Sequence, residues 1–290
     1  MGKGNVGSLG WLGLLWPART VMYRSCPDLD KAVFVSKGGF MDHRLCFDSI
    51  PDQFDKWRIH YSSELFEYLI RYVGIGKGVK VLELGPGTGQ ATDPILDTGC
   101  DYTAIELGKN FSDILMKKYG TRDNYNLIND DFITHDFGDE RFDLIYSAAT
   151  IQWIPENIAF GKTFELLKSG GMLAMMFLHG DYQSADPELY ADIQKVYDKY
   201  FKPPTDYKSG FIYDNAVNYG FTELETKYFK GRREYTADEY IQYIGTHSDH
   251  ITLKEPYRTP FFEGIYDAVK AHGDKIVFDD TYILKTVRKL

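Results

Sequence analysis

Three glycines at alternate positions form the loop of this sequence that is best suited to chemistry. Gly85, Gly87 and Gly89 stand directly behind an apolar run, in the stretch KVLELGPGTGQAT at 80–92. A buried strand that ends in a glycine-rich turn and opens a helix presents backbone N–H groups at the carboxyl edge of a sheet. Open α/β folds bind their ligands at that edge, so the stretch predicts a ligand-binding loop.

The position of the third glycine bears on the kind of ligand. The dinucleotide fingerprint G-x-G-x-x-G, started at Gly85, requires a glycine at position 90. The sequence has Gln90 there, while Pro86 stiffens the turn and Thr88 offers a hydroxyl near the helix start. This tighter loop suits a diphosphate poorly. An NAD(P)-dependent oxidoreductase is therefore the weaker alternative.

Acidic side chains follow the next two predicted strands. Glu106 lies 21 residues after Gly85, the spacing at which a carboxylate reaches ribose hydroxyls across the crevice of such a sheet. In the sequence NDDF, Asp131 can accept a hydrogen bond from the exocyclic amine of adenine, and Phe132 can cover the ring. The alternative for Asp131 is a helix or turn cap, and for Glu106 an exposed carboxylate at a strand end.

Apolar runs alternate with helical patterns from residue 62 onward, as in βαβ units that feed a parallel sheet. Buried strands are predicted at 80–85, 101–107, 125–130, 142–148 and 171–177, and late strands at 220–229 and 275–289. Helices are predicted over 62–76, 108–120, 156–171 and 186–201, with a further helical segment between the two late strands.

These elements predict an α/β fold with a doubly wound, seven-stranded, mostly parallel sheet of the Rossmann-like kind. A helical cap would be inserted between the last two strands. The predicted domain spans residues 41–290, with a cofactor-binding core at about 62–180 and the cap at about 232–274.

The ordered stretches VLELGPGTG, AIEL, NDDF, FDLIYSAATIQWIPE and LLKSGG resemble the motifs of the class I S-adenosylmethionine-dependent methyltransferases over residues 80–177. The resemblance implies S-adenosyl-L-methionine as cofactor. The residues that it implies for cofactor binding are Glu83, Gly85, Gly87, Thr88 and Gly89 at the methionine portion, Glu106 at the ribose, Asp131 and Phe132 at the adenine, and Leu107 and Ala148 beside them.

The upstream stretch FDSIPDQFDKWRIHY at 47–61 is similar to a Y-D-x-x-R-x-x-Y segment that folds over the cofactor in many small-molecule members. Phe54 replaces the usual tyrosine, and Ile59 replaces a proline that often follows the arginine. The similarity implies that Arg58 pairs with the methionine carboxylate and that Tyr61 closes the site. A surface helix with Arg58 in an ordinary ion pair is the alternative.

The acceptor is expected beyond the ends of the fourth and fifth strands. Gln152 and Trp153 would wall it, His179 directly follows the predicted fifth strand, and Tyr243 and His247 come from the cap. Transfer from a sulfonium needs alignment and desolvation rather than an enzyme nucleophile, so the catalytic residues stay undefined. A third ligand with metal-site spacing does not accompany the cap histidines, and no metal is predicted.

The sheet with its cap resembles the methyltransferases that act on small acids, including the trans-aconitate type. We therefore expect a small-molecule acceptor, whose identity and methylated atom the sequence does not specify. A tRNA or protein methyltransferase is the main alternative within enzymes, and a non-enzymatic adenosylmethionine-binding protein is the alternative outside them. The net charge of −9 argues against a broad phosphate-binding face.

The chain of 290 residues is long enough for a large core. Its three cysteines lack CxxC spacing, which favours free thiols in a reducing compartment, and a cytoplasmic location is expected. An uncharged run at 6–16 is too short to span a bilayer. Residues 1–40 are interpreted as a poorly ordered leader or an extension outside the functional protein, with a cleaved signal as a third reading.

Overall fold

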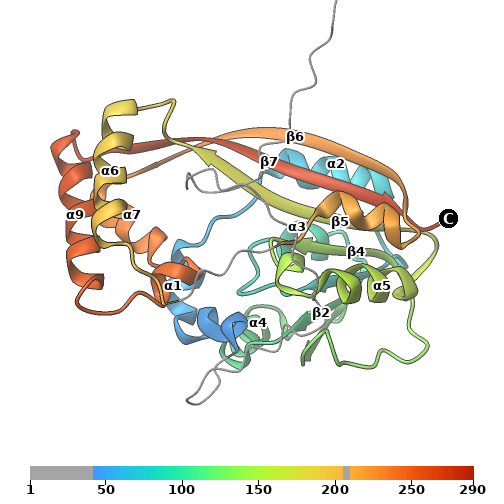
Figure 1. The fold of residues 1–290 in the computed structure, drawn as a ribbon. Coiled ribbons are helices and arrows are strands. Elements are labelled where there is room, and N and C mark those ends of the chain that lie inside the picture. The colour runs from blue at the N-terminus through green and yellow to red at the C-terminus, as the bar shows by residue number, and fades with distance from the viewer. Residues whose placement is uncertain (1–41, 205–209) are drawn as a thin grey trace, which may run out of the picture. The chain divides into compact units, whose positions relative to one another are not determined.

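A seven-stranded mixed sheet forms the centre of the protein (Figure 1). The computed structural model describes residues 42–204 and 210–290, so the interpretation of residues 1–40 lies outside the described part. The strands are β1 (Lys80–Leu84), β2 (Asp101–Glu106), β3 (Tyr125–Asn129), β4 (Phe142–Ala148), β5 (Leu167–Asp181), β6 (Thr222–Tyr235) and β7 (Ile276–Arg288). Their order is β3-β2-β1-β4-β5-β7-β6. The first five run parallel, and β7 is antiparallel to both of its neighbours.

Helices cover both faces of this sheet. They are α2 (Ser63–Val73), α3 (Thr92–Leu96), α4 (Lys109–Tyr119), α5 (Glu156–Leu166) and α6 (Pro187–Tyr200), with short 3-10 turns η2 (Ile151–Trp153) and η3 (Tyr213–Tyr219). In β1, Val81 packs with residues of α2, α3 and α4, whereas Leu82 and Leu84 pack with residues of α5. Both faces of the strand are therefore buried, which explains its continuous apolar sequence.

The predicted cap is confirmed between β6 and β7. It consists of α7 (Ala237–Ile244), α8 (Ser248–Ile251) and α9 (Arg258–Ala271). Thr236 caps α7 in a capping box with Glu239. Leu189 and Ile193 of α6 share an apolar cluster with Phe261 of α9, so α6 joins the cap. The helices α6, α7 and α9 lie together beyond one end of the strands (Figure 1).

Two predicted strand boundaries are wrong. β5 begins at Leu167 and continues to Asp181, although the sequence predicted a helix to 171 and a strand end at 177. β6 continues to Tyr235, six residues past its predicted end. The reason is antiparallel pairing: β7 pairs with β5 from Met172 to Asp181 and with β6 as far as Tyr235. Cross-strand partners extend these strands beyond their own apolar runs.

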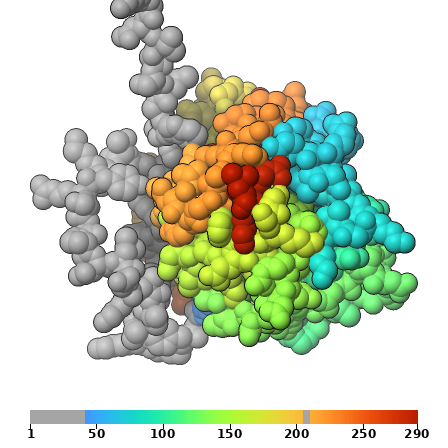
Figure 2. Space-filling model, turned by 90° about the vertical axis from the view of Figure 1, so that its right-hand side faces the viewer, coloured from blue at the N-terminus to red at the C-terminus, as the bar shows by residue number. Residues whose placement is uncertain are grey.

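The N-terminal part of the described chain lies next to the cap. It contains the 3-10 helix η1 (His43–Ser49) and α1 (Pro51–Trp57). α1 contacts both α4 and α7, and η1 contacts α4 and α8. The C-terminus emerges at the opposite end, where it is flanked by residues of the β6 region (Figure 2). Within residues 42–204 and 210–290, every helix is too short or too polar to cross a bilayer.

A buried ion pair joins the two antiparallel strands below the cap. The guanidinium of Arg233 donates to Asp280 from Nε and, at 2.9 Å, from Nη2, and it also donates to the Tyr235 hydroxyl at 2.8 Å. The Asp280 side chain is fully buried. Removing one charge from a buried pair leaves the other uncompensated.

We therefore expect Asp280→Asn to lower the free energy of unfolding by about 3 kcal/mol, measured by urea denaturation. Glu225→Gln is the matched control, because Glu225 forms an exposed pair with Lys227 at 3.8 Å on β6, the strand that carries Arg233. That control should barely change stability. Equal effects of the two substitutions would contradict the assignment of Arg233 and Asp280 as the stabilising pair.

Candidate active site

The glycine loop is held in a shape that side chains do not tolerate. Gly85, Gly87 and Gly89 have φ values of 60°, 63° and 97°. A Cβ atom at Gly85 would lie 2.3 Å from Cγ2 of Thr150, and one at Gly89 would lie 2.8 Å from the Tyr119 hydroxyl. Thr150 Oγ1 also donates to the Gly85 carbonyl at 2.8 Å. Backbone conformation and close approach therefore both require glycine at these positions.

Glu106 ends β2 with its carboxylate turned toward this loop. One oxygen accepts from the Gly87 N–H at 2.9 Å and the other from the Gly108 N–H at 2.8 Å. Burial raises the pKa of this carboxyl to about 7, against the opposing effect of the two N–H donors. Each carboxylate oxygen has a second lone pair, so Glu106 retains acceptor capacity for ligand hydroxyls.

Glu83 is a second buried carboxylate of the site. One of its oxygens accepts from Thr92 Oγ1 at 2.7 Å and from the Tyr102 hydroxyl, which in turn contacts the Tyr146 hydroxyl. The other oxygen, Oε1, lacks a hydrogen-bond partner among the described residues. Burial raises the pKa of Glu83 to about 7. An unpartnered buried acceptor is rare, and a ligand donor such as an ammonium group would satisfy it.

Asp131 follows β3, and its carboxylate forms two hydrogen bonds with Arg44, a residue that was not predicted from the sequence. Arg44 donates to its two oxygens at 3.0 and 2.7 Å, and the Ile133 N–H donates to one of them at 2.9 Å. The turn cap that was the alternative for Asp131 is thus present, whereas its contact with adenine stays a prediction. The pairing with Arg44 spans 87 positions and has no local signal in the sequence. Phe132 is buried against Phe137.

Residues 42–58, which we name the N-terminal strap, contact three of the predicted cofactor-binding regions. Arg44 reaches Asp131. Asp48 accepts a hydrogen bond from the Phe111 N–H at 2.9 Å. Phe111 lies in the first turn of α4, the helix that follows Glu106 in the chain. The Phe54 ring lies 3.1 Å from the Cβ position of Gly87. Lys118 of α4 pairs with Asp55 of the strap and donates to the Thr88 carbonyl at 2.8 Å.

Arg58 and Tyr61 lie where the strap meets the cap. Arg58 donates to the Thr246 carbonyl and hydroxyl at 3.4 Å each, and its guanidinium lies 5.3 Å from the centre of the Phe54 ring. Among the described residues Arg58 forms no ion pair with a carboxylate, so the alternative of an ordinary ion pair is not observed. Tyr61 packs near Tyr282. Burial raises the pKa of Tyr61, and the opposing effect of the Arg58 charge is smaller.

Gln152 and Trp153 follow β4 on the loop that carries Thr150. The Gln152 side chain donates to the Ala149 carbonyl at 2.9 Å and accepts from the Tyr213 hydroxyl at 3.2 Å. Trp153 packs edge-on against Phe47 of the strap, with ring centres 5.5 Å apart. Ala148 is the last residue of β4 and is half-buried. Tyr213, which was not predicted from the sequence, stacks on Phe177 with ring centres 4.5 Å apart. Leu107 directly follows Glu106 and is half-buried.

The three histidine and tyrosine candidates differ in position. His179 does not follow the fifth strand: it is exposed within β5 and pairs with Thr281, because the strand continues past it. Tyr243 ends up near His247 even though α7 stops at Ile244, and their rings meet edge-on at 4.9 Å. Burial, Arg58 and His250 hold the pKa of His247 well below its usual value. His247 is therefore neutral at neutral pH.

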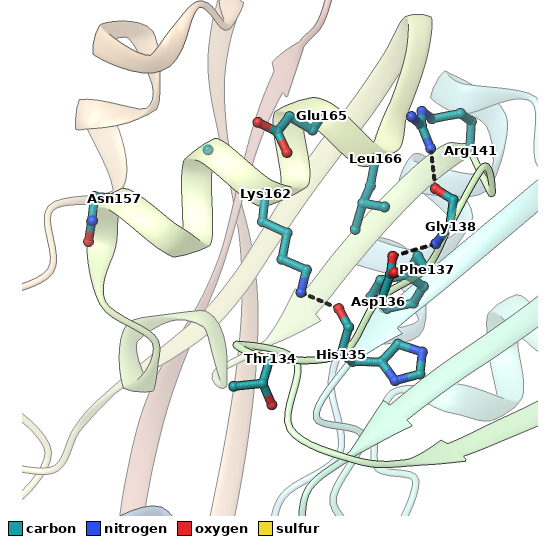
Figure 3. A pocket seen from close by; sticks show the side chains of 11 residues that line it. Thr134, His135, Asp136, Phe137, Gly138, Arg141, Asn157, Lys162, Glu165 and Leu166 are labelled. Atoms are coloured by element: carbon teal, nitrogen blue, oxygen red, sulfur yellow. Dashed lines mark hydrogen bonds between the residues drawn. The ribbon is translucent and has the colours of Figure 1, made fainter.

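A pocket of about 460 Å³ lies between α5 and residues 134–141 (Figure 3). Lys162 extends toward the turn that follows Asp131, where it donates to the carbonyls of Phe132 at 2.7 Å and His135 at 2.5 Å. This cation thus supports the turn, and none of the predicted site residues lines the pocket. Within the described ranges, acidic, histidine and cysteine side chains do not form a metal-binding cluster.

Residues 82–175 match a protein family described as "Methyltransferase domain". Among curated relatives, the chain is similar to ribosomal RNA small subunit methyltransferase A of Pseudomonas fluorescens. The two are 28% identical over 116 residues, which make up 40% of this chain and 42% of that protein. The chain therefore spans less than half the length of the curated relatives that it matches first.

Solved structures share the fold at low sequence identity. A putative type II methyltransferase from Anaeromyxobacter dehalogenans has a TM-score of 0.61 and 16% identity, over 80% of this chain and 98% of that chain. Phosphoethanolamine N-methyltransferase 2 of Haemonchus contortus, solved in complex with S-adenosyl-L-methionine, has a TM-score of 0.52 and 15% identity, over 88% and 61% of the respective chains. The predicted fold class is confirmed.

The raised pKa of Glu83 predicts a pH-dependent stability. Its ordinary value is 4.5 and its value in the fold is about 7. Between these values the folded state holds a proton that the unfolded state has lost, so the free energy of unfolding falls as pH rises through this window. Glu83→Gln removes the titration. Its stability relative to the native protein should therefore increase by roughly 2 to 3 kcal/mol from pH 4.5 to 8.

Denaturant titrations at several pH values measure this difference. Glu64→Gln is the control, because Glu64 is exposed on α2, and its difference from the native protein should stay flat. If the stability difference between Glu83→Gln and the native protein also stayed constant with pH, the raised pKa of the Glu83 carboxyl would be contradicted.

Proposed function

We propose that this chain, which contains a class I S-adenosylmethionine-dependent methyltransferase domain, transfers a methyl group from S-adenosyl-L-methionine to a small-molecule acceptor. The observation that carries the proposal is the glycine loop with its two buried carboxylates, Glu83 and Glu106, at the carboxyl edge of the sheet. These residues lie within the segment that matches the methyltransferase family.

The residues of the loop fit this cofactor. Its bound form supplies a methyl group already activated by the positive sulfonium. The backbone of the glycine loop would bind the methionine portion, and the unpartnered oxygen of Glu83 would accept from its ammonium group. Arg58, which is not ion-paired among the described residues, would bind the methionine carboxylate. Glu106 would bind the ribose and Asp131 the adenine.

Contacts between the strap and the cap support a small acceptor. Arg58 bonds to Thr246, and the Gln53 side chain donates to the Gln242 carbonyl at 3.2 Å. These bonds join α1 to α7 over the end of the sheet. An acceptor site covered by α1 and α7 would suit a small molecule better than a polymer. The excess of negative charge also disfavours a nucleic acid, although the curated relatives that the chain matches first are named for ribosomal RNA.

Side chains of the cap and of the loop after β4 would align the acceptor. Gln152 is fixed by two hydrogen bonds, and Trp153 packs on the strap, so both are suited to orient a substrate and exclude water. A carboxylate acceptor needs no base. For an acceptor that must lose a proton, His247, whose ring meets Tyr243 in the cap, is the proposed base.

Ligand binding tests the proposal directly. We expect S-adenosylmethionine and S-adenosylhomocysteine to raise the melting temperature of the full chain, because a ligand that binds only the native state stabilises it. NAD should have no effect. Stabilisation by NAD alone would favour the oxidoreductase alternative. An unchanged melting temperature with both S-adenosylmethionine and S-adenosylhomocysteine would contradict the proposal.

Glu106→Gln should weaken S-adenosylhomocysteine binding roughly 10- to 100-fold, measured by calorimetry, because the amide replaces a charged acceptor with a weaker one. Glu64→Gln, remote on α2, should bind as the native protein does. Unchanged affinity in Glu106→Gln would mean that the ribose site is misplaced.

Detection of methylated product over a panel of small acids, amines and phenols tests the transfer itself. We expect at least one of these classes to be methylated. Product formed on transfer RNA or protein instead would contradict the small-molecule part of the proposal. Tight binding of S-adenosylmethionine without methylation of any acceptor would favour a non-enzymatic binding protein.

A further inference from the structure

Arg44 holds the carboxylate of Asp131 with both arms of its guanidinium. Nη1 donates to Oδ1 at 3.0 Å and Nη2 donates to Oδ2 at 2.7 Å. Each of the two side chains is 22% exposed, so the pair is largely shielded from water. Two parallel N–H···O bonds of this kind fix the plane of a carboxylate as well as its position.

The hydrogen bonds of Asp131 leave a defined acceptor capacity. Oδ1 accepts from Arg44 and, at 2.9 Å, from the Ile133 N–H, which uses both of its lone pairs. Oδ2 accepts from Arg44 alone and keeps one lone pair. In this arrangement Asp131 offers a ligand one acceptor position in one orientation.

Arg44 is itself fixed from the other side. Its Nε donates to both oxygens of Asp42, at 3.1 and 3.0 Å, and its Nη2 donates to Oδ2 of Asp42 at 2.6 Å. The Arg44 backbone N–H also donates to Asp42 at 3.0 Å, where Asp42 caps η1. The guanidinium therefore cannot turn without losing bonds to two carboxylates.

We propose that Arg44 is a positioning residue that makes this site select adenine over hypoxanthine in the bound cofactor; the inference rests on the proposed function. Adenine presents an amine donor at its 6-position, which matches the single free lone pair of Asp131. Hypoxanthine presents an oxygen at that position and an N–H at the adjacent ring nitrogen. A carboxylate that can rotate would meet this N–H, whereas one that is held by Arg44 faces the oxygen instead.

Discrimination of this kind follows when a site is built around a particular ligand N–H. The analogue that lacks the donor leaves a polar group of the site unpaired. The fixed orientation of Asp131 is what prevents the site from adapting. Loss of Arg44 should therefore reduce selectivity more than it reduces affinity in general.

The experiment compares S-adenosylhomocysteine with S-inosylhomocysteine by calorimetry on the full chain. We expect the native protein to bind the adenine compound roughly 10- to 100-fold more tightly. In Arg44→Gln this ratio should fall to within about threefold, chiefly through tighter binding of the hypoxanthine compound, because the freed Asp131 carboxylate can turn toward its ring N–H. Arg122→Gln is the matched control, because Arg122 follows the C-terminal end of α4, pairs with Asp97 at 2.9 Å and should keep the native ratio.

A second variant, Asp42→Asn, leaves Arg44 in place but weakens its outer anchor, and it should lower the ratio by a smaller factor. An unchanged ratio in Arg44→Gln, or equal affinity of the native protein for both compounds, would overturn the inference while leaving the proposed function intact. If the native protein binds neither compound, the proposed function fails and the inference fails with it.

Discussion

The carboxylate of Glu106 joins two turns at the carboxyl edge of the sheet, and the shape of the site depends on this junction. It accepts from the N–H of Gly87 in the loop after β1 and from the N–H of Gly108 at the start of α4. β1 and β2 are parallel neighbours, with Leu84 opposite Ile105, so their ends must lie side by side. Without this acceptor, two buried backbone donors would lose their partner, at a cost that a folded protein rarely accepts.

Close packing also fixes the glycine loop against the segment that follows β4. Thr150, on the loop after β4, touches Gly85 and donates to its carbonyl. Tyr119 of α4 fills the space at Gly89, and Phe54 of the strap fills the space at Gly87. Each glycine of the loop thus meets a different element. The loop gains its fixed form from three directions, and a side chain at any of the three positions would displace a neighbouring element.

Local sequence signals explain what could be predicted. The apolar run and glycines at 80–89 define a strand and turn from their own composition, and Glu106 follows from the period of the next βα unit. Long-range partners explain what could not. Arg44 finds Asp131 across 87 positions, and residues of β5 beyond Phe177 become strand because β7 pairs with them. His179 was therefore placed after a strand that contains it, whereas His247 and Tyr243 meet through a turn rather than along one helix.

The two buried carboxylates have a consequence for charge at the proposed site. Burial raises the pKa of both Glu83 and Glu106 to about 7, so near neutral pH each carries a substantial fraction of its proton before any ligand binds. The proposed cofactor brings two positive groups, a sulfonium and an ammonium. A positive charge nearby favours the ionised carboxylate and lowers its pKa. Binding and proton release are then linked, and affinity for the cationic ligand must rise with pH through the range in which these carboxyls ionise.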